Sequence, residues 1–210
     1  WNLVPCVLTN NLGVTVGGTV SMAGIGVASF KYGSQGDNVV EMDVGTGDGK
    51  VHVTKDRGKS WTEIMAGLPY QKWVSRIAAS AFDIGTVYMT QNGKRDDDFT
   101  PYVWKSADFG RTWTSIASNI PMGPVNVIRE DPVNKDILYV GTDTGVYAST
   151  DGGKAWHTIG TNLPAVYVHD LVVHPRDNVM VIATHGRGMW VLDVEPINRK
   201  STRQRRSAGN

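Results

Sequence analysis

Three arginines, Arg76, Arg129 and Arg187, are the residues of this sequence best suited to bind an anionic group. Guanidinium groups that converge on one point recognise a carboxylate through paired hydrogen bonds. Arg76 and Arg129 stand at comparable places in two apolar segments, and His169 and Asp170 lie in a third. These five side chains can face a central channel, but no sequence pattern ties the three arginines together. The favoured interpretation is structural: the arginines pair with acidic residues of neighbouring blades, such as Glu130 or Asp170.

Paired carboxylates would be needed for a second chemistry, the hydrolysis of a glycosidic bond. The two carboxyl groups must lie on opposite sides of a sugar, roughly 5 to 10 Å apart. The candidates are Asp43, Asp48 and the run from Asp96 to Asp98. That run follows two basic residues, which is typical of a solvated connection between strands. The sequence therefore assigns no catalytic residue.

Metal and cofactor chemistry has less support. His169 and His174 are five residues apart on or beside one strand, so they project to opposite faces and do not share an ion easily. The lone Cys6 excludes an intrachain disulfide and a cysteine metal cluster. The glycine-rich segment 45–50 looks like a phosphate loop but lies in a strand-turn-strand pattern. We expect neither a metal nor a cofactor.

A repeated segment must position these residues. It begins at Thr54, Ser106 and Ser149, and each copy has Asp two residues later, then Gly, and Trp at its eighth position. The short Asp accepts hydrogen bonds from its own turn, Gly adopts a left-handed conformation, and Trp packs between sheets. The three copies are Asp56, Gly58 and Trp61, then Asp108, Gly110 and Trp113, and finally Asp151, Gly153 and Trp156.

The spacing of the repeat predicts its architecture. The aspartates are 52 and 43 residues apart, which is the period of one four-stranded antiparallel propeller blade. Each of the two later boxes follows three apolar strands and leads into the fourth strand of its blade. The expected first strands are 73–80, 125–130 and 168–174, the second strands 86–91, 137–142 and 179–184, and the third strands 102–106 and 145–150. In the last unit, residues 185–190 replace the box.

The boxes and these strands resemble Asp-box (BNR) propellers of the sortilin type and secreted bacterial propellers labelled glycosyl hydrolases. The resemblance covers roughly residues 37 to 195, and its later segments look like closing blades. It implies an all-β propeller. Members of the group carry six to ten blades, whereas this chain has room for about four, arranged as a closed small ring or an open arc.

Charged residues are distributed unevenly along the chain. The 210 residues carry a net charge of +1, but Arg199, Lys200, Arg203, Arg205 and Arg206 give the end of the chain +5. Residues 1 to 30 carry no charged side chain. We therefore expect an uncharged segment over 1–36 that contributes strands or contacts a partner, blades over 37–195, and a basic, disordered tail over 196–210 that serves as a docking element.

These features favour a non-catalytic interaction or scaffold module. We expect an extrinsic subunit of a larger extracytoplasmic, periplasmic or secreted assembly that lies at a membrane and contacts protein partners and, through the tail, an anionic membrane surface. Nucleic acid is not an expected partner, because the chain shows no recognition motif. The alternative is a glycoside hydrolase or a sialidase-like propeller that binds a glycan. We expect no enzymatic activity outside that alternative.

Overall fold

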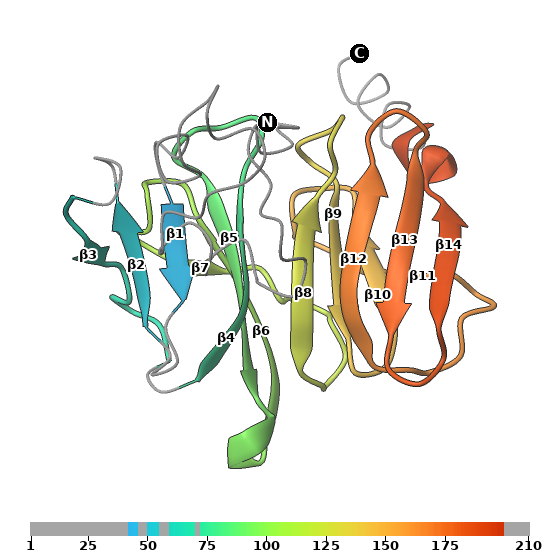
Figure 1. Cartoon of the computed structure of the whole chain (residues 1–210), viewed down its shortest axis with the longest axis horizontal. Coiled ribbons are helices and arrows are strands. Elements are labelled where there is room, and N and C mark those ends of the chain that lie inside the picture. Colours follow the sequence, from blue (N-terminus) through green and yellow to red (C-terminus); the bar gives the residue numbers. More distant parts are fainter. Residues whose placement is uncertain (1–41, 46–49, 55–58, 70–71, 200–210) are drawn as a thin grey trace, which may run out of the picture. The chain divides into compact units, whose positions relative to one another are not determined.

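Strands make up almost all regular structure in the computed structural model, which describes residues 42–45, 50–54, 59–69 and 72–199 (Figure 1). The chain divides into two compact units, Trp1–Val44 with Val51–Ile64, and Gly45–Lys50 with Met65–Asn210. The strands form four sheets of three or four strands. The prediction of an all-β propeller built from antiparallel blades is confirmed, and the choice between ring and arc stays a prediction.

The first unit contains one three-stranded sheet. Its strands are β1 (Met42–Gly45), β2 (Val51–Thr54) and β3 (Thr62–Glu63), in that order. β2 and β3 are antiparallel and enclose the first Asp box, whose Asp56 and Gly58 lie outside the described residues. Trp61 is 42% exposed. Of the two carboxylate candidates here, Asp43 has no described side chain and Asp48 lies outside the described residues.

The second unit holds three blades. The strands of the first are β4 (Trp73–Ala79), β5 (Val87–Gly93), β6 (Asp98–Ser106) and β7 (Thr114–Ser115), with a 3₁₀ turn η2 (Lys94–Asp96). The second blade has β8 (Val125–Glu130), β9 (Leu138–Thr142), β10 (Val146–Ser149) and β11 (His157–Ile159), and the third has β12 (Val168–His174), β13 (Val179–Thr184) and β14 (Met189–Asp193). Neighbouring strands of each blade pair antiparallel.

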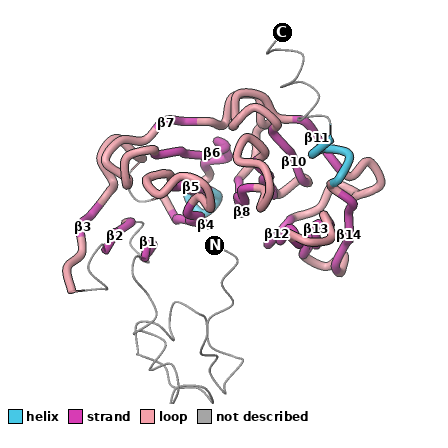
Figure 2. The backbone as a smooth tube through the Cα atoms, turned by 90° about the horizontal axis from the view of Figure 1, so that it is seen from above, coloured by secondary structure: helices cyan, strands magenta, loops and turns pink. Residues whose placement is uncertain are grey.

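The inner strands of the three blades lie beside one another. β8 contacts both β4 and β12. Seen from above, these strands lie on one side of the blades and β7 and β11 lie on the other (Figure 2). β4, β8 and β12 therefore form one edge of the three blades, and it stays a prediction that this edge lines a channel.

The end of the third blade differs from its prediction. The segment His185–Gly186–Arg187–Gly188 is not a degenerate Asp box but the turn between β13 and β14, closed by the Thr184 N–H, which donates to the Gly188 carbonyl oxygen at 3.2 Å. A short helix over 195–199 follows β14 where the other blades have a box and a fourth strand. Ile197 of this helix packs on the core.

Two apolar cores hold the blades together. Tyr88 and Val103 of the first blade pack against Ile128 and Val140 of the second. On its opposite face the second blade packs against the third in the same way. That core joins Val127, Tyr139, Val146 and Ala148 to Val168, Leu171, Met180 and Ile182. Alternation along each strand sends successive side chains to these two faces, so each full blade belongs to two interfaces.

Candidate functional site

A β-bulge interrupts each inner strand at the same place. The bulged residues are Ser75 of β4, Asn126 of β8 and His169 of β12. A bulge leaves one residue out of the ladder and re-aims its side chain. The Ser75 hydroxyl donates to the Val125 carbonyl oxygen of the next blade at 2.8 Å. The three bulges thus place one polar side chain per blade at one level of the inner edge.

Arg76, Arg129 and Asp170 form an ion-pair triad across the three inner strands. Asp170 Oδ2 lies 2.9 Å from Arg76 Nη2, and Asp170 Oδ1 lies 3.0 Å from Arg129 Nη2. Arg129 Nε also donates to the Leu171 carbonyl oxygen at 2.9 Å. The structural pairing considered from the sequence is therefore present. Because two guanidinium groups share one carboxylate, the triad keeps a net positive charge.

The triad is partly buried and incompletely satisfied. The Arg76 and Arg129 side chains are 29% and 27% exposed. Burial lowers the pKa of Arg129 from its usual value; Asp170 opposes this shift and the charge of Arg76 adds to it. The Arg76 Nε is buried and has no hydrogen-bond acceptor among the described residues. A buried donor without an acceptor costs stability.

The remaining channel candidates do not join the triad. Counted from the bulges, Arg129 lies two positions further along its strand than Arg76, so the two are not at equivalent places. Arg187 is exposed in the β13–β14 turn, where its carbonyl oxygen accepts from the Trp190 indole at 3.1 Å. Three converging arginines, as a sialidase would need, are therefore not formed by the described residues.

A polar cluster lies where the loops between second and third strands meet. Lys94 Nζ of the first blade is 2.7 Å from Asp143 Oδ2 of the second, which raises the pKa of Lys94. Lys94 Nζ also lies 5.5 Å from the ring centre of Tyr167, before the third blade. The Asn92 amide donates to Asn126 Oδ1 at 2.8 Å, and the Asn126 amide donates to Asp143 Oδ1 at 2.9 Å. Sequence reasoning missed this cluster, because no motif links its members.

His169 and His185 form a pair that the sequence analysis did not foresee. Their Nε2 and Nδ1 atoms are 3.2 Å apart, and the Tyr167 ring lies 4.6 Å from the His169 ring, centre to centre. His174 lies elsewhere, with its Nδ1 3.3 Å from Asp177 Oδ2. Within the described ranges, no three His, Cys, Asp or Glu side chains gather closely enough to hold a metal ion.

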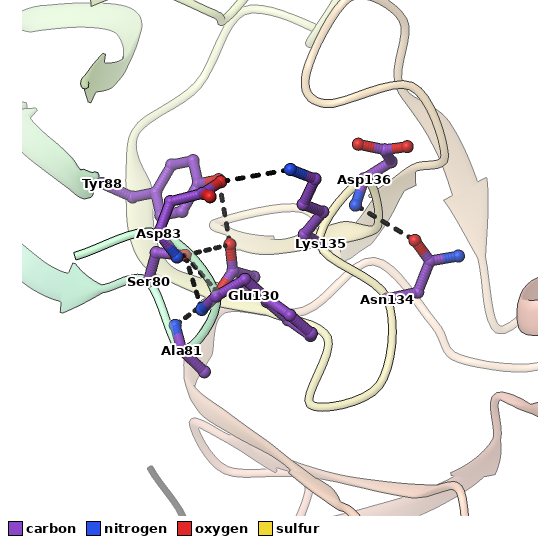
Figure 3. A network of polar contacts seen from close by, with 9 residues as sticks. Ser80, Ala81, Asp83, Tyr88, Glu130, Asn134, Lys135 and Asp136 are labelled. Carbon is purple, nitrogen blue, oxygen red and sulfur yellow. Dashed lines mark hydrogen bonds and ion pairs between the residues drawn. The ribbon is translucent and has the colours of Figure 1, made fainter. Parts of the chain in front are cut away.

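At the opposite end of the inner strands, Glu130 joins the first two blades (Figure 3). Its carboxylate accepts from the Ser80 hydroxyl at 2.8 Å, the Ala81 N–H at 2.8 Å and the Tyr88 hydroxyl at 3.1 Å. Burial, and then the charge of Glu130, raise the pKa of Tyr88. Every one of these partners comes from the neighbouring blade, so Glu130 stabilises the interface and is not free to act as an acid or base.

The second Asp box holds its own turn. Asp108 Oδ1 accepts from the Thr112 N–H at 2.9 Å, and Asp108 Oδ2 accepts from the Thr112 hydroxyl at 2.7 Å. These bonds, with that from Ser106, lower the pKa of Asp108 to about 2. Gly110 has φ of 79°, in the left-handed region. Trp113 is partly buried.

The third box follows the same plan and adds a contact between blades. Asp151 Oδ1 accepts from the Ser149 hydroxyl at 2.7 Å and from the Lys154 and Ala155 N–H groups, both at 3.0 Å. Gly153 has φ of 94°. Trp156 is 2% exposed, and its indole donates to the Ile116 carbonyl oxygen of the first blade at 2.7 Å. The two described box aspartates, Asp108 and Asp151, are thus engaged in turns at the end of the blades.

The acidic run before β6 is structural as well. Asp98 accepts from the Thr100 N–H at 3.0 Å and the Tyr102 hydroxyl at 2.8 Å, and Lys72 Nζ lies 3.1 Å away. These contacts, led by Thr100, hold the pKa of Asp98 well below its usual range. Asp96 lies 3.5 Å from the same Lys72 ammonium. None of these contacts creates a proton donor for glycoside hydrolysis.

The basic tail is described only at its start. Arg199 Nη2 lies 2.6 Å from Glu195 Oε1, one helical turn before it. Lys200, Arg203, Arg205 and Arg206 lie outside the described residues, so the docking role of the tail stays a prediction. In the part of the chain that is described, no helix has the length and apolar character to cross a membrane.

Two protein families match separate parts of the chain. Residues 101–203 match the sortilin family, described as "Sortilin, neurotensin receptor 3", and residues 3–55 match the FAD binding domain family. The chain is 53% identical over 49 residues to cytokinin dehydrogenase 10 of Oryza sativa subsp. japonica, which is 23% of this chain and 9% of that protein. Cytokinin dehydrogenase 3 of Arabidopsis thaliana is 51% identical over 49 residues, again 23% and 9%.

The FAD match does not define a flavin site. It overlaps residues 37–55, which the sequence analysis assigned to the blades, and that boundary stays a prediction. Inside the matched segment the structure describes only β1 and residues 50–54. The chain spans about a tenth of the dehydrogenases' length. Within the matched segment, side chains are described only for residues 50–54.

Solved structures match the blades. One is the GH74 xyloglucanase of Xanthomonas campestris, with a TM-score of 0.55 and 17% sequence identity over 70% of this chain and 26% of that chain. Another is an ancestral GH74 enzyme, with a TM-score of 0.56 and 22% identity over 70% of this chain and 20% of that chain. A third is YCF48 bound to D1 peptide, with a TM-score of 0.52 and 16% identity over 70% of this chain and 44% of that chain. The chain thus spans 26% and 20% of the length of these two GH74 enzymes and 44% of the length of YCF48. Together with the sortilin match, these likenesses confirm the resemblance to sortilin-type Asp-box propellers.

Proposed function

We propose that this chain is a non-catalytic binding module whose inner strands recognise a carboxylate-bearing segment of a protein partner. The observation that carries the proposal is the triad, in which Arg76 and Arg129 share the single carboxylate of Asp170. A partner carboxylate can accept hydrogen bonds from the exposed parts of both guanidinium groups, because the Arg76 and Arg129 side chains are 29% and 27% exposed. Recognition then needs no chemical step.

The carboxylates around the triad support binding rather than catalysis. Asp143 accepts from Lys94 and Asn126, and Asp170 accepts from the two arginines. The general acid of a glycosidase needs a raised pKa. The described carboxyl groups with a shifted pKa are all shifted downward, namely Asp98, Asp108, Asp151 and Asp177.

The likeness to YCF48 bound to D1 peptide also favours a peptide as the ligand, although that likeness concerns the fold alone. We place the module outside the cytoplasm, in a larger assembly at a membrane, with the basic tail as a second contact. The tail would attract an anionic surface only at short range, because salt screens exposed charges beyond about 10 Å.

A peptide titration tests this proposal. Fluorescence anisotropy of a fluorescein-labelled hexaglutamate peptide should report binding that weakens as salt is added. Arg76→Ala and Arg129→Ala should each weaken binding by about tenfold, because each removes a charged donor. Arg111→Ala, at an exposed arginine of the second Asp box, is the matched control. A triple variant with Arg203→Ala, Arg205→Ala and Arg206→Ala shows how much of the peptide binding comes from the tail and not from the triad. Affinity unchanged in both triad variants contradicts the proposal.

A carbohydrate ligand is the second candidate. The Trp73 indole is 53% exposed at the start of β4, and the Arg95 guanidinium lies 4.7 Å from its ring centre. Exposed indoles bury large apolar area against a ligand. Binding of xyloglucan oligosaccharides that Trp73→Ala abolishes, with no effect of Arg129→Ala, would favour this function over peptide recognition. Release of sugar products would favour the glycoside hydrolase.

A further inference from the structure

The strand pairing of the third blade brings two histidines together. The ladder joins Val168 of β12 to Thr184 of β13. Just beyond this pair, the His185 N–H donates to the Tyr167 carbonyl oxygen at 2.9 Å. The bulge on β12 leaves His169 out of the ladder and re-aims its side chain. One imidazole therefore comes from a bulge and the other from the β13–β14 turn, and the backbone of two paired strands sets the distance between them.

The turn that carries His185 is tightly closed. The Thr184 N–H and hydroxyl both donate to the Gly188 carbonyl oxygen, at 3.2 and 2.6 Å. Gly188 has φ of 69°, in the left-handed region that glycine adopts without strain. The Tyr167 ring contacts both imidazoles, with its centre 4.6 Å from that of His169 and 6.2 Å from that of His185. The two histidines are thus held in place by contacts other than their own.

The separation of their ring nitrogens matches that of two ligands on one metal ion. His169 Nε2 and His185 Nδ1 are 3.2 Å apart. Imidazole nitrogens bind Zn²⁺ tetrahedrally at about 2.0 to 2.1 Å, so two of them on one ion lie about 3.3 to 3.4 Å apart. Both histidines are exposed, so water can satisfy each ring without the other. The pair can therefore open its mutual hydrogen bond and close on an ion with a small rotation of the rings.

The neighbouring charged groups leave the pair accessible to a cation. The Lys94 ammonium, which lies near Tyr167, is paired with Asp143 at 2.7 Å. Asp170 follows His169 in the chain, but its carboxylate is held by the two arginines of the triad. The described residues therefore supply two ligands, and the other coordination positions are open to water or to a donor atom of a ligand.

We infer that His169 and His185 bind a divalent transition-metal ion, with Zn²⁺ as the ion that fits their spacing. Imidazole suits Zn²⁺, Cu²⁺ and Ni²⁺, whereas Mg²⁺ and Ca²⁺ take oxygen ligands. The sequence predicts no metal, because His169 and His174 project to opposite faces of a strand; the turn brings His185 to His169 instead. This site does not depend on carboxylate recognition at the triad.

Isothermal titration calorimetry with ZnCl₂ tests the inference. The full chain should carry Cys6→Ser throughout, because a thiolate also binds Zn²⁺. We expect one ion per chain, and His169→Ala and His185→Ala should each weaken binding by more than about tenfold, because each removes a ligand. His174→Ala is the matched control, at an imidazole that is 51% exposed and lies beside Asp177. Its affinity should equal that of the parent chain, and thermal melting shows that each variant is folded.

Electron paramagnetic resonance of the Cu²⁺-loaded chain gives a second readout. Its spectrum should show superhyperfine coupling to two imidazole nitrogens in the parent chain and in His174→Ala, and to one in His169→Ala or His185→Ala. A folded parent chain that binds no Zn²⁺ overturns the inference. Zn²⁺ affinity or a Cu²⁺ spectrum that is unchanged in both His169→Ala and His185→Ala overturns it as well, because the ion then lies elsewhere on the chain.

Discussion

Asp108 accepts hydrogen bonds that favour its ionised form, and this links the blade turns to pH. Its pKa is lowered to about 2 in the folded chain, against about 3.9 for an unfolded aspartate. The ionised carboxylate therefore contributes stability above pH 4, and this contribution is lost as the pH falls toward 2. We expect Asp108→Asn to reduce the loss of melting temperature between pH 5 and pH 2. An identical pH profile for wild type and variant would contradict this account.

Asp151 offers a separate test at neutral pH. Asp151→Ala removes three hydrogen bonds within the box and should lower the free energy of unfolding by about 1 to 2 kcal/mol. Asp177→Ala removes a carboxylate that is 46% exposed and paired with Arg176, so we expect a smaller loss than for Asp151→Ala. Urea unfolding of both variants checks this. Equal losses would show that the box aspartate is no more than a surface charge.

At the scale of elements, Gly141 of β9 sets how closely the second and third blades approach. A Cβ atom at this position would lie 2.6 Å from Val168 Cγ1 and 2.7 Å from Val127 Cγ1. We expect Gly141→Ala to destabilise the chain by about 1 to 3 kcal/mol through overpacking. Differential scanning calorimetry measures the change. A variant that melts with the wild type would mean that this interface is looser than the structure indicates.

The sequence predicts the elements better than their register. Asp108, Gly110 and Trp156 specify turns and anchors through local chemistry, so the boxes and the strands around them can be read directly. The bulges at Ser75 and Asn126 cannot, because register depends on how neighbouring strands pack. For this reason Arg76 and Arg129 were predicted at equivalent places, and the structure has them two positions apart.

Other parts of the site depend on contacts between blades. Lys94 and Asp143 come from loops of different blades, and no spacing in the sequence links them. The segment around His185 was read as a replaced box, because its glycines and Trp190 imitate one. Without the strand pairing of β13 and β14, that turn cannot be told from a box. Pairing of the arginines with an acidic residue such as Asp170 is the interpretation that the sequence favours, and the structure shows this pairing.

At the scale of the molecule, the two family matches fall on the two parts of the chain. The sortilin match, residues 101–203, lies within the second unit, and the FAD match over 3–55 lies mostly within the first. Each of the three blades of the second unit contributes one side chain to the triad of Arg76, Arg129 and Asp170. The binding that we propose at the triad therefore requires the assembled blades and not a single repeat.

In the binding mode that we propose, Asp170 competes with an incoming carboxylate for both arginines, so removing its charge tests the central claim most directly. Asp170→Asn keeps an oxygen that can accept from the Leu171 N–H, as Oδ1 does at 2.8 Å, but leaves both guanidinium groups without their anion. The measurement is the dissociation constant of the hexaglutamate peptide for this variant and the wild type, with thermal melting as the control for folding. We predict severalfold tighter binding by a folded Asp170→Asn chain. Unchanged or weaker binding would contradict recognition of a carboxylate at the triad.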